Sequence, residues 1–533
     1  MPPAKPDTPS SAPPGAASNA SPNGTAFREV ELKLHVAPAD LARVAGLPAV
    51  REGADGPATV SHLRTVYYDT PDLRLFASGI ALRVRRDGDR FIQTLKTVNS
   101  ATPGDSAAVA VRREWEWTVA GEAPDVSVLT ASGVAGLVPA DAQGALRPLF
   151  VTDFRRTAVL VRPDPATAIE VAVDEGHVTA GSETLPISEV ELELKAGRVG
   201  RLFDLALRLQ QAVPMRIGTE SKAELGLRLV TGRLPPPVES EPLALSPVTT
   251  VAEAYRHILR HALRQFLANE ACALAGGDVE GLHRMRIALR RLRIAHRLFA
   301  PVIASPEADR LVAESRTLAK RLGPARGWDV LLAGVIDPLS SSPKAPAGLA
   351  LLAATARNAG AGPAREAVAA ILAPHCAATV LALAAWLEDG RWLGEADKER
   401  RAALNAPVTT VAPVWLSLRL AKLGKTAKIP DEPKDREKLR RRLRTLRYVA
   451  EFFRGLYAEA ATLPFLAALD SLLAALDADH DAATGRRMLA ALPGADAATV
   501  AATAAWIDRQ ADKRRKALPD LWKRFRDTPV FWA

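Results

Sequence analysis

The periodicity of apolar residues changes near residue 250 of this 533-residue chain, and that change constrains its fold more than any other feature. From Arg28 to about Val119, and again up to Lys195, apolar residues alternate with polar ones in short runs broken by glycine, proline and aspartate. Such runs are typical of β-strands. Beyond Val251 the apolar residues recur at helical spacing, among many alanines, leucines and arginines. We therefore predict an α+β chain with a β-rich front half and an all-α back half.

The composition of the segments predicts four regions. They are a disordered leader over residues 1–26, a β domain over 27–231, a linker rich in proline over 232–246, and a helical domain over 247–533. Helices are expected at Val251–Leu274, Val279–Phe299, Glu307–Leu322 and Arg436–Tyr457. Alanine-rich segments broken by proline, from Ala345 to Leu423, are predicted to separate two helical bundles.

Several protein classes are disfavoured by what the sequence lacks. The two cysteines, Cys272 and Cys376, form no CxxC, which argues against a disulfide framework or a cysteine-built zinc site and favours a cytoplasmic location. No uncharged apolar run reaches the length of about 18 residues expected of a membrane span, so we expect no membrane contact. A GxxxxGK[ST] motif is absent, which argues against a P-loop nucleotide hydrolase.

Net charge is divided unevenly between the two halves. Of the formal net charge of +10, the stretch from Phe27 to Val230 contributes −3, with 24 basic and 27 acidic residues, which leaves +13 for the remainder. A polyanion is therefore the expected partner of the back half.

Charged residues occupy alternate positions in several predicted strands. Glu29, Glu31 and Lys33 lie on one face of the first strand, with apolar residues between them. For one strand alone, a solvated face is the simpler interpretation. The alternation recurs, however, at Arg83 and Arg85, at Arg112, Glu114 and Glu116, and at Glu189, Glu191, Glu193 and Lys195. Together these strands could line the polar interior of a closed barrel. Carboxylates there would hold hard divalent cations, and basic side chains would neutralise phosphate oxygens.

An ordered series of motifs resembles the CYTH superfamily, the triphosphate tunnel metalloenzymes. The series starts with ExExK at Glu29, Glu31 and Lys33. It continues through YYDTPDLRL, SGIALRVRR, QTLK, REWEW, VDEG, SEVELELKAG and ESKAELGLRL, over about 200 residues. The resemblance implies an eight-stranded antiparallel β-barrel whose tunnel binds triphosphate with Mg²⁺ or Mn²⁺.

The same resemblance implies roles for individual residues. Catalytic roles fall to Glu29, Glu31 and Lys33. The implied metal ligands are Glu29, Glu31, Asp174, Glu189, Glu191 and Glu193, and the sequence leaves open which two of the last three bind metal. The implied phosphate-binding residues are Arg83, Arg85, Lys96, Lys222 and one of the adjacent pair Arg155 and Arg156. For Asp69, within YYDTP, a role in the site is less favoured than a role as the cap of a turn.

Two arginine-rich helices stand out in the back half. One face of the first carries His283, Arg286, Arg290, Arg293 and Arg297. One face of the second carries Arg440, Arg444 and Arg447. Like charges at this spacing destabilise an isolated helix by roughly 0.2–0.5 kcal/mol per pair, so helix stabilisation does not explain them. A polyanion-binding groove between the two helices does, and solvated faces near salt-bridge partners are the simpler alternative.

The motif HRMRIALRRLR, with the weaker LAKRLGPARGWDV and LRTLRYVAEFF, resembles the CHAD domain, a helical domain of two four-helix bundles. The resemblance implies that inorganic polyphosphate binds the two basic faces and Lys320. This chain departs from the family pattern at Glu437, where a histidine is common, and at Arg444, where lysine is usual. Nucleic acid is disfavoured as a partner because the basic helices lack interleaved aromatic residues.

Together the two resemblances imply a divalent-metal-dependent hydrolase that converts inorganic triphosphate to pyrophosphate and phosphate, joined to a polyphosphate-binding domain. Such a protein could associate with polyphosphate granules. Three alternatives remain: a thiamine triphosphatase, an activity like that of class IV adenylate cyclases, and a non-enzymatic polyphosphate-binding adaptor.

Overall fold

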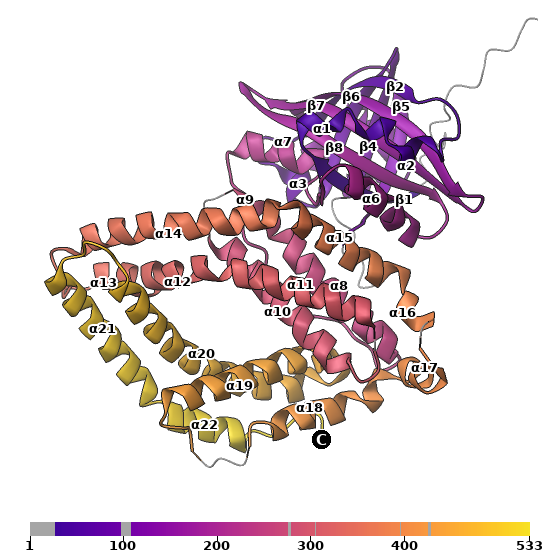
Figure 1. Ribbon diagram of the computed structural model, residues 1–533. Coiled ribbons are helices and arrows are strands. Elements are labelled where there is room, and N and C mark those ends of the chain that lie inside the picture. Colours follow the sequence, from indigo (N-terminus) through magenta and orange to yellow (C-terminus); the bar gives the residue numbers. More distant parts are fainter. Residues whose placement is uncertain (1–26, 98–107, 276–278, 304, 395, 425–427) are drawn as a thin grey trace, which may run out of the picture.

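The computed structural model describes residues 27–97, 108–275, 279–303, 305–394, 396–424 and 428–533 (Figure 1). The predicted leader, residues 1–26, lies outside the described residues. An antiparallel sheet domain is followed by a larger helical domain, as the change of periodicity predicts.

Nine antiparallel strands form one sheet in the described part of the N-terminal domain. Their bounds are β1 (Phe27–Val36), β2 (Thr59–Asp69), β3 (Ile80–Asp87), β4 (Arg90–Thr97), β5 (Ala110–Val119), β6 (Arg147–Asp164), β7 (Thr167–Ala180), β8 (Glu183–Ala196) and β9 (Met215–Ile217). The hydrogen-bonded order is β5-β4-β3-β2-β6-β7-β8-β1-β9, and β5 also pairs with β1. The expected eight-stranded barrel is not confirmed, because a ninth strand pairs with the end of β1.

Seven helices accompany the described strands. They are α1 (Pro38–Leu41), α2 (Pro48–Arg51), α3 (Arg74–Ala77), α4 (Val126–Ala131), α5 (Ala140–Gln143), α6 (Gly200–Ala212) and α7 (Lys222–Thr231). Short 3₁₀ turns lie at Val44–Gly46 and Ala135–Leu137. The buried leucines of α6 pack in one core with Leu32 and Leu34 of β1.

Register explains why the charges of neighbouring strands meet. Lys33 of β1 lies opposite Glu191 of β8, while the next residue pair, Leu32 and Leu192, is buried on the other face. Because side chains alternate across a strand, one face of β1 and β8 carries charges and the other carries the core. We call the first of these the charged face.

The helical domain contains α8 to α22 within the described residues. Their bounds are α8 (Val251–Ala268), α9 (Glu270–Leu274), α10 (Val279–Phe299), α11 (Pro306–Arg321), α12 (Gly323–Leu331), α13 (Asp337–Ser340), α14 (Leu349–Leu372), α15 (Pro374–Asp389), α16 (Arg391–Gly394), α17 (Lys398–Asn405), α18 (Ala412–Ala421), α19 (Pro433–Phe453), α20 (Glu459–Ala490), α21 (Ala497–Arg515) and α22 (Leu518–Asp527). Leu332–Ile336 is one π-helical turn, and Val408–Thr410 and Arg454–Leu456 are 3₁₀ turns. The segment from Ala345 to Leu423, expected to separate two bundles, is itself largely helical.

The two domains share a continuous hydrophobic core. Helix α15 packs against α6, beside which it lies in Figure 1, and against β9. A single cluster of buried apolar residues runs from the strands into α8, α10 and α19. Ion pairs join the domains at its edge, between Arg216 and Glu270 and between Arg198 and Asp389. The sheet domain therefore packs directly against the helical domain and is not joined to it by the linker alone.

Among the described helices, only α20 has the length and mean hydropathy, 1.5 over its most apolar stretch, that a membrane span needs, while α14 and α15 qualify only as a pair bent by 52°. Phe465, Leu469 and Leu472 of α20 are buried in the core shared by the two domains. Packing inside the protein covers 44% of the most apolar stretch of this helix, and the expectation of no membrane contact stays a prediction.

Candidate functional site

Three carboxylates gather on the charged face where β7 and β8 run side by side. Asp174 lies opposite Glu189 in the β7–β8 register, and Glu191 is two residues further along β8. One oxygen from each lies within 4.8 Å of the others, and Asp174 and Glu189 are 0% and 1% exposed. We call Asp174, Glu189 and Glu191 the carboxylate cluster.

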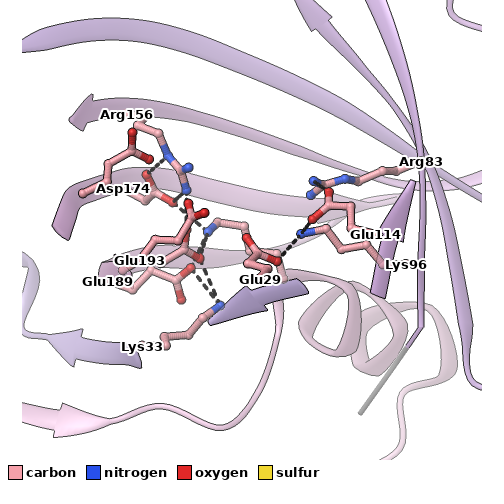
Figure 2. Close-up of polar contacts among 12 residues, drawn as sticks. Glu29, Lys33, Arg83, Lys96, Glu114, Arg156, Asp174, Glu189 and Glu193 are labelled. Atoms are coloured by element: carbon pink, nitrogen blue, oxygen red, sulfur yellow. Dashed lines mark hydrogen bonds and ion pairs between the residues drawn. The ribbon is translucent and has the colours of Figure 1, made fainter. Parts of the chain in front are cut away.

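Basic side chains surround the carboxylate cluster (Figure 2). The Lys222 ammonium donates to all three carboxylates, at 2.7 Å to Asp174, 2.9 Å to Glu191 and also to Glu189. The Lys33 ammonium lies 3.2 Å from Glu189 and 3.3 Å from Glu191. The Arg156 guanidinium grips Asp174 through two hydrogen bonds, of 2.7 and 2.6 Å, and also contacts Glu191. The cluster is therefore a dense ionic network inside the protein.

These contacts shift the pKa values of the network. Burial alone would raise the pKa of Glu191, but Lys222, Arg156 and Lys33 hold it well below its usual range. Burial alone would lower the pKa of Lys222, but Asp174, Glu189 and Glu191 raise it well above its usual value. Both groups therefore remain charged at neutral pH.

Helix α7 places Lys222 by two local devices. Ser221 and Glu224 form a capping box at the start of the helix, which fixes Lys222 as its first residue. Gly226, one turn further on, lies against the ring of Phe150 on β6, and a Cβ at this position would come within 2.1 Å of that ring. The helix can therefore approach the sheet closely enough for the ammonium of Lys222 to reach inside it.

A second ionic group lies beside the first on the charged face (Figure 2). The Lys96 ammonium contacts Glu114 at 2.7 Å and Glu29 at 3.1 Å, and Arg83 contacts Glu114 at 3.2 Å. Arg85 approaches Glu116 at 3.6 Å. Glu114 was not among the predicted site residues, although its alternation with Trp115 is visible in REWEW. We call Glu29, Arg83, Lys96 and Glu114 the second ionic group.

Not every predicted residue joins these groups. The structure separates Arg155 from Arg156: Arg155 points outward, pairs with Glu175 at 2.8 Å and is 58% exposed in its side chain. Of the two arginines left open by the sequence, only Arg156 lies on the charged face, and its phosphate-binding role stays a prediction. Glu193 pairs with Lys195 at 2.6 Å and lies outside the carboxylate cluster, as does Glu29. Glu31 is buried, and its carboxylate interacts electrostatically with Lys33, Lys96 and Arg156.

Asp69 has a structural role. Its carboxylate accepts hydrogen bonds from the backbone N–H groups of Thr70, Leu75 and Phe76, at 2.7, 2.8 and 3.0 Å. It thus caps the turn that starts α3, which was one of the two interpretations of YYDTP.

The donor set of the carboxylate cluster fits a hard divalent cation. Oxygen donors from three carboxylates are the ligands that Mg²⁺ and Mn²⁺ favour. In this arrangement the ammonium groups of Lys222 and Lys33 supply the positive charge that such a cation would bring. The residues present therefore suit the metal that the sequence motifs imply.

The helical domain contains a cavity of about 650 Å³ between α10, α12, α19 and α20. Its basic lining includes His283, Arg286, Arg290, Arg326, Arg440, Arg444 and Arg447. Residues Glu239 to Leu243 of the linker form part of the wall. The buried Asn269 holds the linker in place: its side-chain amide accepts a hydrogen bond from the backbone N–H of Val238 and donates one to the carbonyl of Val238, both at 2.9 Å. We call this space the central cavity.

The two arginine faces of the central cavity differ in their partners. On α19, Arg440 pairs with Glu437 and with Asp477 at 2.8 Å, Arg444 contacts Asp477, and Arg447 pairs with Asp470 at 2.7 Å. On α10, no described carboxylate lies within ion-pair distance of Arg286 or Arg290. Arg286 instead donates to the carbonyl of Gly323 at 2.8 Å. Uncompensated positive charge is therefore concentrated on α10.

Electrostatics confirm this concentration. Burial and the guanidinium groups of Arg326, Arg286 and Arg290 lower the pKa of His283 to about 3. Burial and Arg290, Arg326 and Arg293 lower the pKa of Arg286 to about 10. Both shifts show that this wall of the cavity repels further positive charge and would attract an anion.

Three predicted polyphosphate-binding residues lie outside the central cavity. Lys320 is exposed on α11, Arg293 is half-buried beside the cavity, and Arg297 is exposed in a different groove. The expected single basic face of α10 is thus divided. Arg326, which lies in the motif LAKRLGPARGWDV but was not predicted to bind polyphosphate, lines the central cavity.

Comparison with known proteins identifies both domains. The model of the CYTH domain matches residues 28–226, and the model of the CHAD domain matches residues 257–490. An inorganic triphosphatase of Haemophilus influenzae is 35% identical over 170 residues, which are 31% of this chain and 46% of that protein. The match thus spans about half the length of this curated relative.

Two solved structures resemble parts of the chain. The CHAD domain of the plant Ricinus communis is 27% identical, with a TM-score of 0.46, and covers 55% of this chain and 98% of its own. A Hippeastrum protein assigned as an adenylyl cyclase, with a dominant triphosphatase activity, is 18% identical, with a TM-score of 0.28, and covers 39% of this chain and 97% of its own. The CYTH match falls on the sheet domain and the CHAD match falls on the helical domain. The chain therefore carries an N-terminal CYTH domain followed by a C-terminal CHAD domain.

Proposed function

We propose that the N-terminal domain is a divalent-metal-dependent triphosphatase that hydrolyses inorganic triphosphate to pyrophosphate and phosphate at the charged face. The observation that carries the proposal is the carboxylate cluster, in which three carboxylates share the ammonium of Lys222 beside Lys33 and Arg156. The inorganic triphosphatase relative supports the choice of substrate.

The residues of the charged face divide into two roles. Asp174, Glu189 and Glu191 would hold Mg²⁺ or Mn²⁺, which when bound would offset the negative charge of the substrate and polarise its phosphoryl oxygens. Glu29 and Glu31, of the ExExK motif, lie next to the cluster and complete the acidic side of the site. Basic side chains would bind the phosphate oxygens: Lys33, Arg83, Arg85, Lys96, Arg156 and Lys222.

Ion pairing in the free protein prepares the basic side chains for this role. Lys33, Lys96 and Arg156 are each held on the charged face by buried carboxylates, so their positions are set before substrate arrives. Groups fixed in this way stabilise the charge that develops on the leaving pyrophosphate without reorganising. The ammonium of Lys222 would turn from the carboxylates toward the phosphate oxygens when the cluster holds a cation.

The test is phosphate release from tripolyphosphate, thiamine triphosphate and ATP by the full chain, each with Mg²⁺, Mn²⁺ or EDTA. We expect much the largest kcat/KM for tripolyphosphate and none with EDTA. Glu189→Gln should lose activity, while Glu175→Gln, an exposed glutamate on the same pair of strands, should keep it. Cyclic AMP formation from ATP, faster thiamine triphosphate hydrolysis, or full activity in EDTA would contradict the proposal.

We also propose that the central cavity binds inorganic polyphosphate, and that the protein acts in the cytoplasm. The observation that favours the first proposal is the wall of α10, where Arg286 and Arg290 have no carboxylate partner among the described residues. Replacing both by glutamine in the full chain should weaken polyphosphate binding, whereas phosphate release by the sheet domain should be unchanged. Equal binding by the variant and the parent chain would refute it.

A further inference from the structure

A second basic groove lies on the opposite side of α19 from the central cavity. It has a volume of about 590 Å³ and is formed by the end of α10, by α18 and by the start of α19. Its basic lining residues are Arg297, Arg419, Lys422, Lys434, Lys438, Arg441 and Arg442. We call this space the outer groove.

The outer groove is separate from the central cavity. No described residue lines both. On α19, the basic residues of the outer groove centre on a direction about 140° from that of Arg440, Arg444 and Arg447, at 3.6 residues per turn. The two basic faces of this helix therefore look into different spaces, and only one of them was expected from the sequence.

Positive charge in the outer groove is largely uncompensated. The one carboxylate in its lining, Glu437, is already engaged by Arg440, Arg441 and His480. Within the described parts of the chain, no ion-pair partner lies near Arg297, Arg419, Lys422, Lys434, Lys438 or Arg442. Burial and the neighbouring Arg297 lower the pKa of Arg419, so these two guanidinium groups repel one another. Such a concentration of cations is stable only with an anion or screening solvent nearby.

One face of α10 connects the two spaces. Arg286 and Arg290 line the central cavity, Arg293 follows, and Arg297 lines the outer groove, all on one side of the helix. Arg293 interacts electrostatically with both Arg290 and Arg297. The rise from Arg286 to Arg297 is about 16 Å along the helix, so only a long anion can reach both spaces.

We propose that the outer groove is a second binding site for a linear polyphosphate chain, so that the helical domain selects long chains that span both spaces. The proposal rests on polyphosphate binding in the central cavity and extends it. The lining of the outer groove contains no aromatic side chain among the described residues, which disfavours the base stacking that single-stranded nucleic acids use.

The test compares long-chain polyphosphate with a short chain of a few phosphates, using the full-length protein. In the outer-groove variant, the exposed Arg297, Lys438 and Arg442 are replaced by glutamine. In the control, Arg509, Lys513 and Arg514, which are exposed on α21 and line neither space, are replaced in the same way. Both variants lose the same charge. Helical content by circular dichroism checks that both remain folded.

We expect the outer-groove variant to bind the long chain about tenfold or more weakly than the control. The slope of log affinity against log salt concentration should become shallower by about 0.7–0.9 for each phosphate that is no longer neutralised. Binding of the short chain in the central cavity should not change.

Equal long-chain binding and equal salt dependence in the two variants would overturn the inference. The inference would also be overturned if the outer-groove variant lost binding to RNA but kept its binding to polyphosphate. Failure of the central-cavity variant, Arg286→Gln with Arg290→Gln, to weaken either chain would instead refute the underlying function.

Discussion

The ammonium nitrogen of Lys222 lies 2.7 Å from Oδ2 of Asp174 and also contacts the two glutamates of the carboxylate cluster. A lysine from a helix thus occupies the centre of a group of oxygen donors contributed by two strands. In the absence of metal it balances the charge of the three carboxylates together with Lys33 and Arg156. The response of the protein to metal should therefore depend on this one side chain.

Replacing Lys222 by alanine should make the stability of the protein depend on metal. In EDTA, unfolding free energy should fall by about 3–5 kcal/mol, the usual cost of removing one partner from a buried ion pair. Mg²⁺ or Mn²⁺ should restore much of this loss, because a bound cation stabilises the folded state in proportion to its affinity. Melting temperatures with and without metal measure the effect. Equal metal-induced shifts in the variant and the parent chain would show that Lys222 does not take the place of a cation in the carboxylate cluster.

The neighbouring arginines of β6 offer a matched pair of substitutions. Arg156→Gln removes a guanidinium from the charged face and should lower kcat/KM for tripolyphosphate by about 100-fold, a loss typical of one charge-stabilising donor. Arg155→Gln removes an equal charge from the outer surface, where exposed ion pairs contribute roughly 0–1 kcal/mol, and should leave kinetics and stability nearly unchanged. A similar loss of activity in both variants would mean that net charge, rather than position, matters.

Gly226→Ala should disturb the site without touching a charged residue. The new Cβ would overlap the ring of Phe150, and overpacking of this kind costs about 1–3 kcal/mol. Helix α7 would have to move outward and carry Lys222 away from the carboxylate cluster, so activity and thermal stability should fall together. Gly136→Ala is the control, because nothing lies within 4 Å of a Cβ at that position. Unchanged activity in Gly226→Ala would show that the placement of Lys222 is not critical.

Polyphosphate binding should strengthen as the pH falls. With its pKa lowered to about 3 by burial and by Arg326, Arg286 and Arg290, His283 is neutral in the free protein at neutral pH. Bound phosphate groups would favour the charged imidazolium and raise this pKa, so binding takes up a proton and tightens as the pH falls through the raised pKa. Calorimetry in buffers of different ionisation enthalpy measures the proton uptake.

The matched substitution for this pH effect is His283→Gln, which should remove most of the proton uptake and weaken binding more at low pH than at high pH. His480→Gln is the companion variant, since His480 also lines the central cavity but already pairs with Glu437. Proton uptake that persists in full without His283 would assign the titration to another group.

The sequence predicted the order of strands and helices, because both periodicities are local. The alternation of Glu29, Glu31 and Lys33 was sufficient to place them on one face, and the same reasoning placed Glu189 and Glu191. Alternation cannot say, however, which of two adjacent arginines faces inward. The register of β6 with β7 decides this, by placing Arg156 opposite Asp174.

The arrangement around the basic helices was harder to predict for a similar reason. Asp470 and Asp477 of α20 are two turns apart, a spacing that suits the arginines of α19, yet only tertiary packing shows that they meet. Likewise, the regular spacing of arginines on one face of α10 does not indicate that they line two different spaces. That division arises because α19 lies against α10 and separates the central cavity from the outer groove.

The core that runs from the strands into α8, α10 and α15 has a thermodynamic consequence. Although the chain has a recognisable linker, cutting it within residues 232–246 should not release two independent halves, because each would expose the apolar surface that the other covers. Heat and denaturant should instead melt the molecule in one cooperative transition, with the sheet and the helices lost together. Two domains by ancestry would then be one unit of folding.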